Sequence, residues 1–189
     1  MSHRTQNLTA DAIAALSARI DRPVVLVGLM GAGKSTVGRK LAALLGTSFV
    51  DADDAIEQAA QQSIAEIFAE YGEPYFRDGE RRVIARLMQE RYGVIATGGG
   101  AFVNDETRAL ILSQGIAVWI NCPVDILVER TARKNTRPLL QNGDPHEILS
   151  RLHAERMPFY SQAPIVVVSE NGPHGDTAMT ILGALDQWL

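Results

Sequence analysis

The stretch GLMGAGKST, Gly28 to Thr36, decides the fold of this chain. It has the spacing G-x-x-x-x-G-K-S, with an apolar run at 23–28 before it and a helical apolar stripe after it, formed by Val37, Leu41, Leu44 and Leu45. A glycine-rich turn between a strand and a helix lets backbone N–H groups surround phosphates, and the helix N-terminus adds partial positive charge. The sequence therefore predicts a P-loop that binds a nucleotide, although the motif does not identify the phosphate acceptor.

Two side chains of this loop have specific expected roles. Lys34 is expected to bridge the β- and γ-phosphates, and Ser35 to place its hydroxyl on Mg²⁺. The backbone that would hold the nucleotide phosphates belongs to Gly31, Ala32, Gly33, Lys34, Ser35 and Thr36.

Short apolar runs alternate with helical stripes along the chain. The runs are 23–28, 48–53, 93–98, 116–121 and 164–169. Most are continuous rather than alternating, which is typical of strands buried on both faces of a parallel sheet. The further stripes are Ile64, Ile67 and Phe68; Val83, Ile84, Leu87 and Met88; Ile148, Leu149 and Leu152; and the C-terminal run 177–189. This order predicts an α/β sandwich of about five parallel strands with helices on both faces.

Composition narrows the class of protein. The 189 residues suit one domain, and the net charge of −4 argues against a general nucleic-acid binder. No apolar run approaches the ~18 residues of a membrane span, so we expect no membrane partner. The lone cysteine, Cys122, permits no internal disulfide, and we expect it to be buried in a protein of a reducing compartment, the cytoplasm.

Two segments flank or interrupt the predicted domain, which spans 23–189. In the N-terminal extension, 1–22, Ile13, Leu16 and Ile20 have helical spacing and predict a short helix. The segment 132–145 holds three basic residues, prolines and an Asn-Gly pair. A long, polar connection inside a compact domain is often a mobile lid over an active site, and the alternative is a merely solvated loop.

A pair of carboxylates follows the second apolar run. Asp51 and Asp53 are two residues apart, so on a strand they would point to the same face. At the carboxyl end of a strand they could serve a metal-bound water, an acceptor hydroxyl, or both. The alternative is an acidic helix start that Asp53 or Asp54 caps.

Arginines supply the candidate cations. Arg77 precedes Glu80 by three residues, where a helix would place the carboxylate beside the guanidinium; an ordinary surface pair is the alternative. Arg130, Arg137 and Arg156 follow along the chain, and closure of the predicted lid would bring Arg137 to the phosphates. Arg156 could instead be the polar end of a helix.

A second glycine cluster, Gly98 to Gly100, follows the run VIAT. Three glycines after a buried strand open bare backbone into the ligand crevice, where an acceptor could approach closely. We therefore interpret this triplet as the floor of the acceptor site, with a plain flexible turn as the alternative.

Taken in order, these motifs resemble the shikimate kinase family. The resemblance runs from about Pro23 to the C-terminal helix and rests on GLMGAGKST, FVDADDAIE, GEPYFRDGE, TGGGAF, TRPLL and ERMPFY. It implies transfer of the γ-phosphoryl group of ATP to the 3-hydroxyl of shikimate, a step towards chorismate and the aromatic amino acids, with Mg²⁺ as cofactor. ATP and shikimate are then the partners, and we expect a monomer.

The resemblance also implies residue roles. By matching position, Asp51 resembles the residue that reaches Mg²⁺ through water, and Asp53 the one that hydrogen-bonds shikimate hydroxyls and is the candidate base. The remaining implied roles are a carboxylate grip by Arg77 and Arg156, substrate contacts from Gly99 and Gly100, an adenine contact from Arg130, a lid arginine at Arg137 and an adenine loop at Gly172 and Pro173. Lys34, Asp53 and Arg137 form the expected catalytic set.

One departure and two alternatives accompany this resemblance. Gln162 stands where the family usually has Glu. The nearest alternative is another P-loop small-molecule kinase, such as a gluconate kinase or a nucleoside monophosphate kinase. The other is a catalytically silent family member that acts as a regulatory binding module.

Overall fold

A computed structural model describes residues 8–90, 93–133, 140 and 143–189. Within these residues five strands form one parallel sheet in the order β2-β3-β1-β4-β5. The strands are β1 (Val24–Val27), β2 (Phe49–Asp51), β3 (Val94–Ala96), β4 (Ile116–Asn121) and β5 (Ile165–Val168). The predicted five-stranded parallel α/β fold is therefore confirmed.

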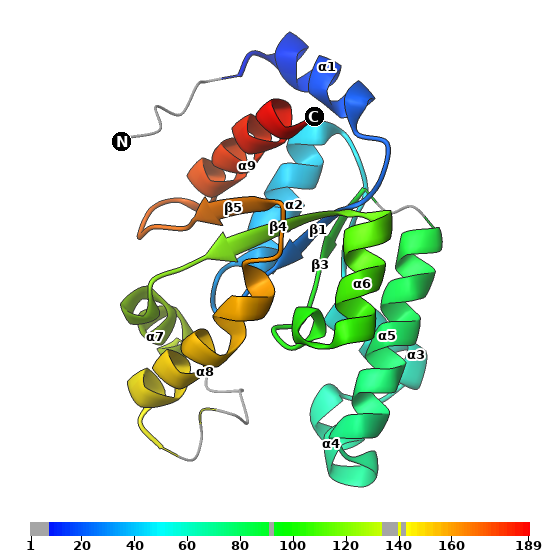
Figure 1. Cartoon of the computed structure of the whole chain (residues 1–189), viewed down its shortest axis with the longest axis vertical. Coiled ribbons are helices and arrows are strands. Elements are labelled where there is room, and N and C mark those ends of the chain that lie inside the picture. Colours follow the sequence, from blue (N-terminus) through cyan, green and yellow to red (C-terminus); the bar gives the residue numbers. More distant parts are fainter. Residues whose placement is uncertain (1–7, 91–92, 134–139, 141–142) are drawn as a thin grey trace.

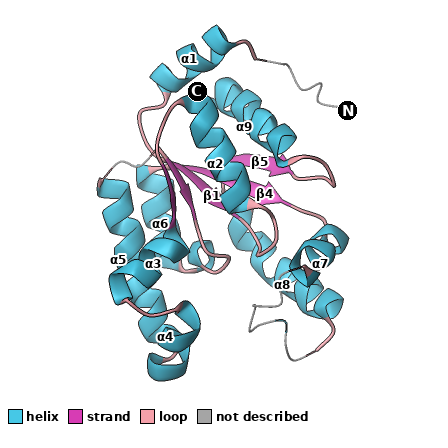
Figure 2. Ribbon diagram, turned by 180° about the vertical axis from the view of Figure 1, so that it is seen from behind, coloured by secondary structure: helices cyan, strands magenta, loops and turns pink. Residues whose placement is uncertain are grey.

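Helices cover both faces of the sheet. They are α1 (Ala10–Arg19), α2 (Lys34–Leu45), α3 (Ala52–Ala60), α4 (Ile64–Tyr71), α5 (Glu73–Gln89), α6 (Asp105–Gln114), α7 (Val124–Ala132), α8 (Pro145–Tyr160) and α9 (His174–Trp188), with a 3-10 turn η1 (Ala101–Val103). Helices α2 and α9 pack together on one face, and α5 and α6 pack together on the other (Figures 1 and 2). The predicted stripes did not include α3, α6 or α7.

The strand order places the site. Strand β1 lies between β3 and β4, and Leu26 of β1 and Asp51 of β2 both pair with Ala96 of β3. Because parallel strands end at the same edge, the loops after β1, β2 and β3 open side by side. The sequence separates these loops widely, and the register brings them to one crevice.

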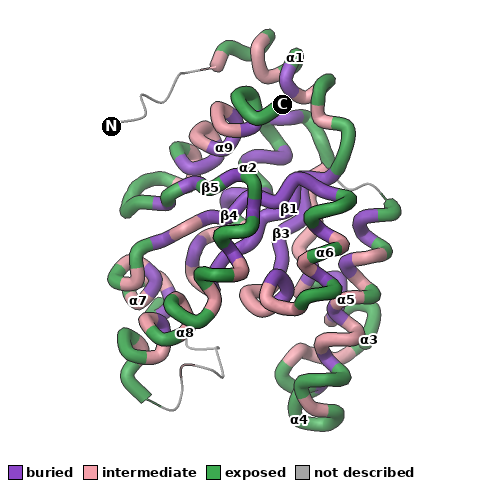
Figure 3. Tube along the Cα trace, in the orientation of Figure 1, coloured by how far each residue is buried: buried purple, intermediate pink, exposed green. Residues whose placement is uncertain are grey.

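The core is built on the central strands. All residues of β1 and β3 are buried, and the purple trace of Figure 3 shows them at the centre of the molecule. Strand β5 differs from the prediction, since Val166 and Val168 are about half exposed. Strand β5 lies at one edge of the sheet; α9 packs on it, and the side that carries Val166 and Val168 is open to water.

Some residues of the predicted apolar stripes also lie at the surface. Leu44 of α2 and Phe68 of α4 are 40% and 37% exposed. Phe68 still contacts Phe76 of α5, with ring centroids 4.6 Å apart. Helical spacing identifies the buried side of a helix, but the width of that side depends on the neighbouring helices.

The N-terminal segment forms a helix that packs on the domain. Helix α1 begins after Thr9, whose hydroxyl accepts a hydrogen bond from the amide of Ala12, and it buries Leu16 in the core. Ser17 Oγ donates to the carbonyl of Leu45 at 2.8 Å, and Arg19 contacts Asp186 of α9 at 2.6 Å. In the part of the chain that the structure describes, none of the helices has the length and apolar character needed to cross a membrane.

Candidate active site

The P-loop joins β1 to α2 and depends on three glycines. Gly28, Gly31 and Gly33 have φ values of 140°, 83° and 91°, which side-chain-bearing residues rarely adopt. This backbone curls in front of the first turn of α2. The ammonium group of Lys34 is buried and donates to the carbonyls of Gly28 at 2.7 Å and Leu29 at 2.8 Å. The loop thus places a lysine charge and a helix N-terminus at one point, where they favour phosphate.

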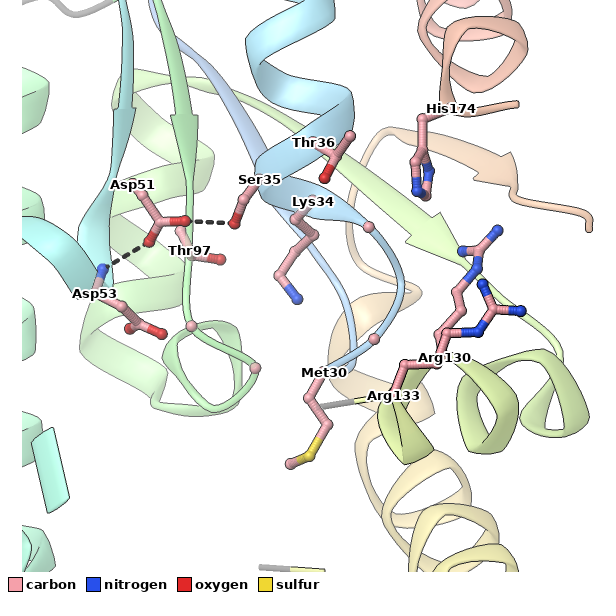
Figure 4. A pocket seen from close by; sticks show the side chains of 14 residues that line it. Met30, Lys34, Ser35, Thr36, Asp51, Asp53, Thr97, Arg130, Arg133 and His174 are labelled. Atoms are coloured by element: carbon pink, nitrogen blue, oxygen red, sulfur yellow. Dashed lines mark hydrogen bonds between the residues drawn. The ribbon is translucent and has the colours of Figure 1, made fainter. Parts of the chain in front are cut away.

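Ser35 and Asp51 link the P-loop to the end of β2. Ser35 Oγ donates a hydrogen bond to the carboxylate of Asp51, which also accepts from the amide of Asp53 at 3.0 Å (Figure 4). A hydroxyl and a carboxylate are the oxygen ligands that Mg²⁺ prefers, and this cation usually keeps several waters. Among the described residues, no group of three or more His, Cys, Asp and Glu side chains is placed to hold a metal. The donor set therefore fits a Mg²⁺ ion held largely by water and phosphate.

The prediction that Asp51 and Asp53 lie on the same face of one strand is wrong. Strand β2 ends at Asp51, which is the N-cap of α3, and Asp53 lies in the first turn of that helix. Neither Asp53 nor Asp54 is the cap. The chain turns into a helix directly at Asp51, because its carboxylate can satisfy an amide of the first helical turn. The two carboxylates still line the same cavity.

The environment of Asp53 favours its neutral form. Burial raises its pKa from 3.8 to about 6, and the negative charges of Asp51 and Glu80 act in the same direction. Lys34 opposes this shift. A carboxyl group with such a pKa is still largely ionised at pH 7 and accepts a proton more readily than an ordinary aspartate.

Each glycine of the triplet after β3 lies against a different charged side chain. A Cβ atom added to Gly98 would lie 2.8 Å from Asp53 Oδ1, and one added to Gly99 would lie 3.2 Å from Arg156 Nη1. A Cβ atom added to Gly100 would collide with the guanidinium of Arg77. Since Gly100 has φ −94°, close approach rather than backbone strain explains this glycine.

Arg77 is held by two carboxylates of its own helix. Its Nη1 donates to Glu80 Oε2 at 2.7 Å, and its Nε contacts Glu73 Oε1 at 3.4 Å. The side chain of Glu80 is buried, so the pair is not the ordinary surface contact that the sequence left open. Burial raises the pKa of Glu80, and the positive charges of Arg77 and Arg156 oppose that rise. Glu80 therefore attracts both arginines electrostatically, and its hydrogen bond orients Arg77.

Helix α8 carries Arg156 and, one turn later, Tyr160. The buried hydroxyl of Tyr160 donates a hydrogen bond to the carbonyl of Gly99. This bond joins the helix that carries Arg156 to the glycine that faces it. Tyr160 is the last residue of the motif ERMPFY, but the sequence does not predict this hydrogen bond.

Gln162, the departure from the family pattern, retains a polar partner. Its Oε1 accepts from Arg108 Nε at 3.1 Å, and Arg108 also donates to the carbonyls of Phe102 and Val103. Arg108 thus connects the turn after the glycine triplet with the end of α8. A neutral amide serves this contact because it offers the same acceptor oxygen as a carboxylate.

Arg130 occupies the other end of the site. From α7 its guanidinium contacts the carbonyl of Ala32 at 3.4 Å, Ser169 Oγ at 3.3 Å and the carbonyl of Glu170 at 3.0 Å. It therefore ties the P-loop to the segment between β5 and α9. Cys122 is buried against the same guanidinium, 3.7 Å from Nη1.

One cavity of about 590 Å³ extends from the P-loop and Arg130 to the acidic pair and the first two glycines of the triplet. Its lining residues are Met30, Gly31, Gly33, Lys34, Ser35, Thr36, Asp51, Asp53, Thr97, Gly98, Gly99, Arg130, Arg133 and His174 (Figure 4). Arg130, Arg133 and His174 lie at one end, and Asp51 and Asp53 at the other. Ala32, Gly100, Arg77 and Arg156 are not in this lining, and the last three adjoin it through the glycine triplet.

The structure adds residues and leaves one undescribed. Met30, Thr97, Arg133 and His174 line the cavity without having been predicted as site residues. Met30 and Thr97 stand inside quoted motifs and Arg133 inside the predicted lid, but nothing in the sequence marks His174. Pro173 is the N-cap of α9, and its neighbour His174 is the residue of this segment that lines the cavity. Arg137 and most of the predicted lid lie outside the described residues, while Ala132 ends α7 and Pro145 begins α8.

A P-loop after the first strand of a parallel sheet, an acidic pair and a glycine triplet that lies against two arginines define a P-loop kinase. The family model of shikimate kinase matches residues 30–186. The chain is 60% identical to a shikimate kinase of Novosphingobium aromaticivorans, over 100% of both chains. This protein belongs to the shikimate kinase family.

Solved structures agree with this assignment. Shikimate kinase from Acinetobacter baumannii, in complex with shikimate, is 37% identical and superposes with a TM-score of 0.85, over 95% of this chain and 98% of that one. A gluconokinase from Sinorhizobium meliloti, at 16% identity and a TM-score of 0.62, covers 89% of this chain and 94% of its own and shares the fold alone.

Proposed function

We propose that this protein transfers the γ-phosphoryl group of ATP to the 3-hydroxyl of shikimate, with Asp53 as the base and Arg77 and Arg156 as the carboxylate clamp. One observation carries this assignment of roles. The three consecutive glycines face a carboxylate and two guanidinium groups in turn, namely those of Asp53, Arg156 and Arg77. A small acid with several hydroxyl groups needs this combination, since its carboxylate pairs with arginine and its hydroxyl with aspartate.

The donor half of the site would be the P-loop. Lys34, which now bonds to Gly28 and Leu29, would turn to the β- and γ-phosphates, and the amides of Gly31 to Thr36 would surround them. Mg²⁺, when bound, neutralises charge on these phosphates, and Ser35 with Asp51 would hold it, the latter through water. Arg130 and Pro173 would contact the adenine, and Arg137 the transferring phosphoryl group.

The acceptor half would supply position and a proton acceptor. As the 3-hydroxyl oxygen bonds to the γ-phosphorus, the bond from that phosphorus to the oxygen bridging it to the β-phosphate breaks. The hydroxyl proton passes to Asp53, whose pKa of about 6 leaves it ionised at neutral pH and ready to accept. ADP leaves with the bridging oxygen, and shikimate 3-phosphate forms.

An assay of ADP release tests the substrate directly. The purified protein is given ATP, Mg²⁺ and, one at a time, shikimate, gluconate and a nucleoside monophosphate. We expect turnover with shikimate and with neither of the other two acceptors. We also expect shikimate to bind more tightly when ADP is present. Turnover with gluconate or a nucleotide but not with shikimate would refute the proposal, and ATP binding without any turnover would support a regulatory protein instead.

We further propose that the enzyme works as a monomer in the cytoplasm. Donor and acceptor groups of the site come from one chain, and a lone buried cysteine suits a reducing compartment. Light scattering during size-exclusion chromatography, with and without both substrates, tests the oligomeric state. A mass twice the chain mass of 20.5 kDa would contradict it.

A further inference from the structure

The imidazole of His174 occupies a place that the motifs do not explain. His174 is the first residue of α9, and it lines the donor end of the cavity with Arg130 and Arg133. In Figure 4 its ring points from α9 towards the P-loop. The N-cap of this helix is Pro173, so capping of α9 does not call on the imidazole of His174. The side chain therefore belongs to the cavity rather than to the helix terminus.

The ring packs directly on the P-loop. A Cβ atom added to Gly33 would lie 2.9 Å from Cε1 and 3.1 Å from Nδ1 of His174. The same atom would lie 3.7 Å from Nη1 of Arg130. The imidazole and the guanidinium thus meet over the residue that immediately precedes α2.

The surroundings decide which ring nitrogen carries hydrogen. Nδ1 is shielded from solvent and has no hydrogen-bond partner among the residues that the structure describes. Burial, with the positive charges of Arg130 and Lys40, holds the pKa of His174 below its usual value, so the ring is neutral at pH 7. A neutral imidazole has one N–H and one lone pair. An N–H at the enclosed Nδ1 would have no acceptor and would cost more than an unpaired lone pair, so we place the hydrogen on Nε2.

The cavity around the N–H group of His174 carries positive charge that favours an anion. Helix α2 begins at Lys34 and helix α9 at His174, so two helix N-termini with partial positive charge meet beside the Arg130 guanidinium. Lys34 and the P-loop amides are committed to the β- and γ-phosphates in the proposed function. The phosphate that joins them to the nucleoside lies next along the nucleotide, towards Arg130.

We propose that His174 is a nucleotide-binding residue whose Nε2–H donates a hydrogen bond to an oxygen of the α-phosphate. This inference rests on the proposed use of ATP, and it adds a contact that no P-loop motif contains. His174 would hold the nucleotide between α9 and Gly33 and would make no contact with the acceptor.

A ligand with one altered atom tests this contact. Calorimetric titrations at pH 7.5 compare ADP with the two isomers of ADPαS, in which sulfur, a weak acceptor, replaces one α-phosphate oxygen. Wild type should bind one isomer about fivefold less tightly than ADP, and His174→Phe should bind ADP about fivefold less tightly and lose this discrimination. His174→Gln, which keeps an N–H donor, should retain part of the ADP affinity and of the discrimination.

Controls separate this contact from folding and from the acceptor. Replacing ADP with ADPβS should weaken binding by the same factor in wild type and in His174→Phe. The variant His146→Phe, changed at an exposed residue of α8, should bind ADP like wild type. Equal melting temperatures would show that the variants fold. Undiminished discrimination between ADP and ADPαS in His174→Phe overturns the inference. Since these titrations need no acceptor, a failure to phosphorylate shikimate would refute the proposed function alone.

Discussion

Gly100 lies against the guanidinium of Arg77, so closely that a methyl group on the glycine would overlap the arginine side chain. The same glycine triplet meets Asp53 and Arg156. The backbone after β3 is therefore the surface against which three charged side chains are set. We therefore expect the proposed acceptor half of the site to be sensitive to a single added carbon atom.

Replacing Gly100 with alanine should damage acceptor binding selectively. The new methyl group should displace the guanidinium of Arg77. We expect kcat/KM for shikimate to fall about 10- to 100-fold, while KM for ATP stays within about twofold of the wild-type value. Initial-rate kinetics with each substrate varied in turn measure the two effects. The matched control is Gly183→Ala in α9, where an added Cβ meets nothing within 4 Å. That variant should keep full activity and gain about 0.5–1 kcal/mol of stability.

Arginine-to-lysine substitution at Arg77 or Arg156 should raise KM for shikimate about tenfold or more, with little effect on KM for ATP. Lysine keeps the charge but lacks the planar pair of donors that matches a carboxylate. At position 77 it also loses part of the contact with Glu80. Similar losses for both substrates would place these arginines outside the acceptor clamp.

Asp53→Asn should abolish turnover and yet stabilise the folded protein at high pH. Folding raises the pKa of Asp53 from 3.8 to about 6, so the folded state holds this proton more tightly than the unfolded state. Its stabilising contribution is complete below about pH 4 and is lost as pH rises through about 6. At pH 8 the ionised carboxylate should therefore make wild type about 2–3 kcal/mol less stable than a form with a neutral side chain there.

Urea unfolding at pH 5 and pH 8, without nucleotide or Mg²⁺, measures this difference. The stability gain of Asp53→Asn should grow between the two pH values, and ADP should still bind the variant. A gain that does not change with pH would contradict the raised pKa. Near-normal turnover would contradict the role of Asp53 as a base.

Leu16→Ala should destabilise the whole domain without altering catalysis. Leu16 is 1% exposed and belongs to the main core, so its truncation should cost about 2–4 kcal/mol. For a chain of this size that corresponds to a melting temperature roughly 5–15 °C lower. Thermal unfolding and kcat at 20 °C check the two halves of the prediction. An unchanged melting temperature would show that α1 is an independent appendage.

The motifs predicted much of the site because each depends on residues that are close together in the sequence. The P-loop spacing located the phosphate site, and the Arg77–Glu80 spacing located a real ion pair. The strand assumption for Asp51 and Asp53 failed because a single carboxylate at the strand end caps the next helix, which periodicity does not reveal. His174 and Thr97 were missed because they reach the cavity through the packing of α9 and the register of β3.

The sequence by itself determined the class of fold, the phosphate-binding loop and the family, because glycine spacing and apolar periodicity are properties of neighbouring residues. The tertiary structure decided which distant side chains meet. Parallel register brings the ends of β1, β2 and β3 to one edge, and α8 then brings Arg156 and Tyr160 against Gly99. That a glycine faces each charged group follows from this close approach, since only a residue without a side chain leaves room for it.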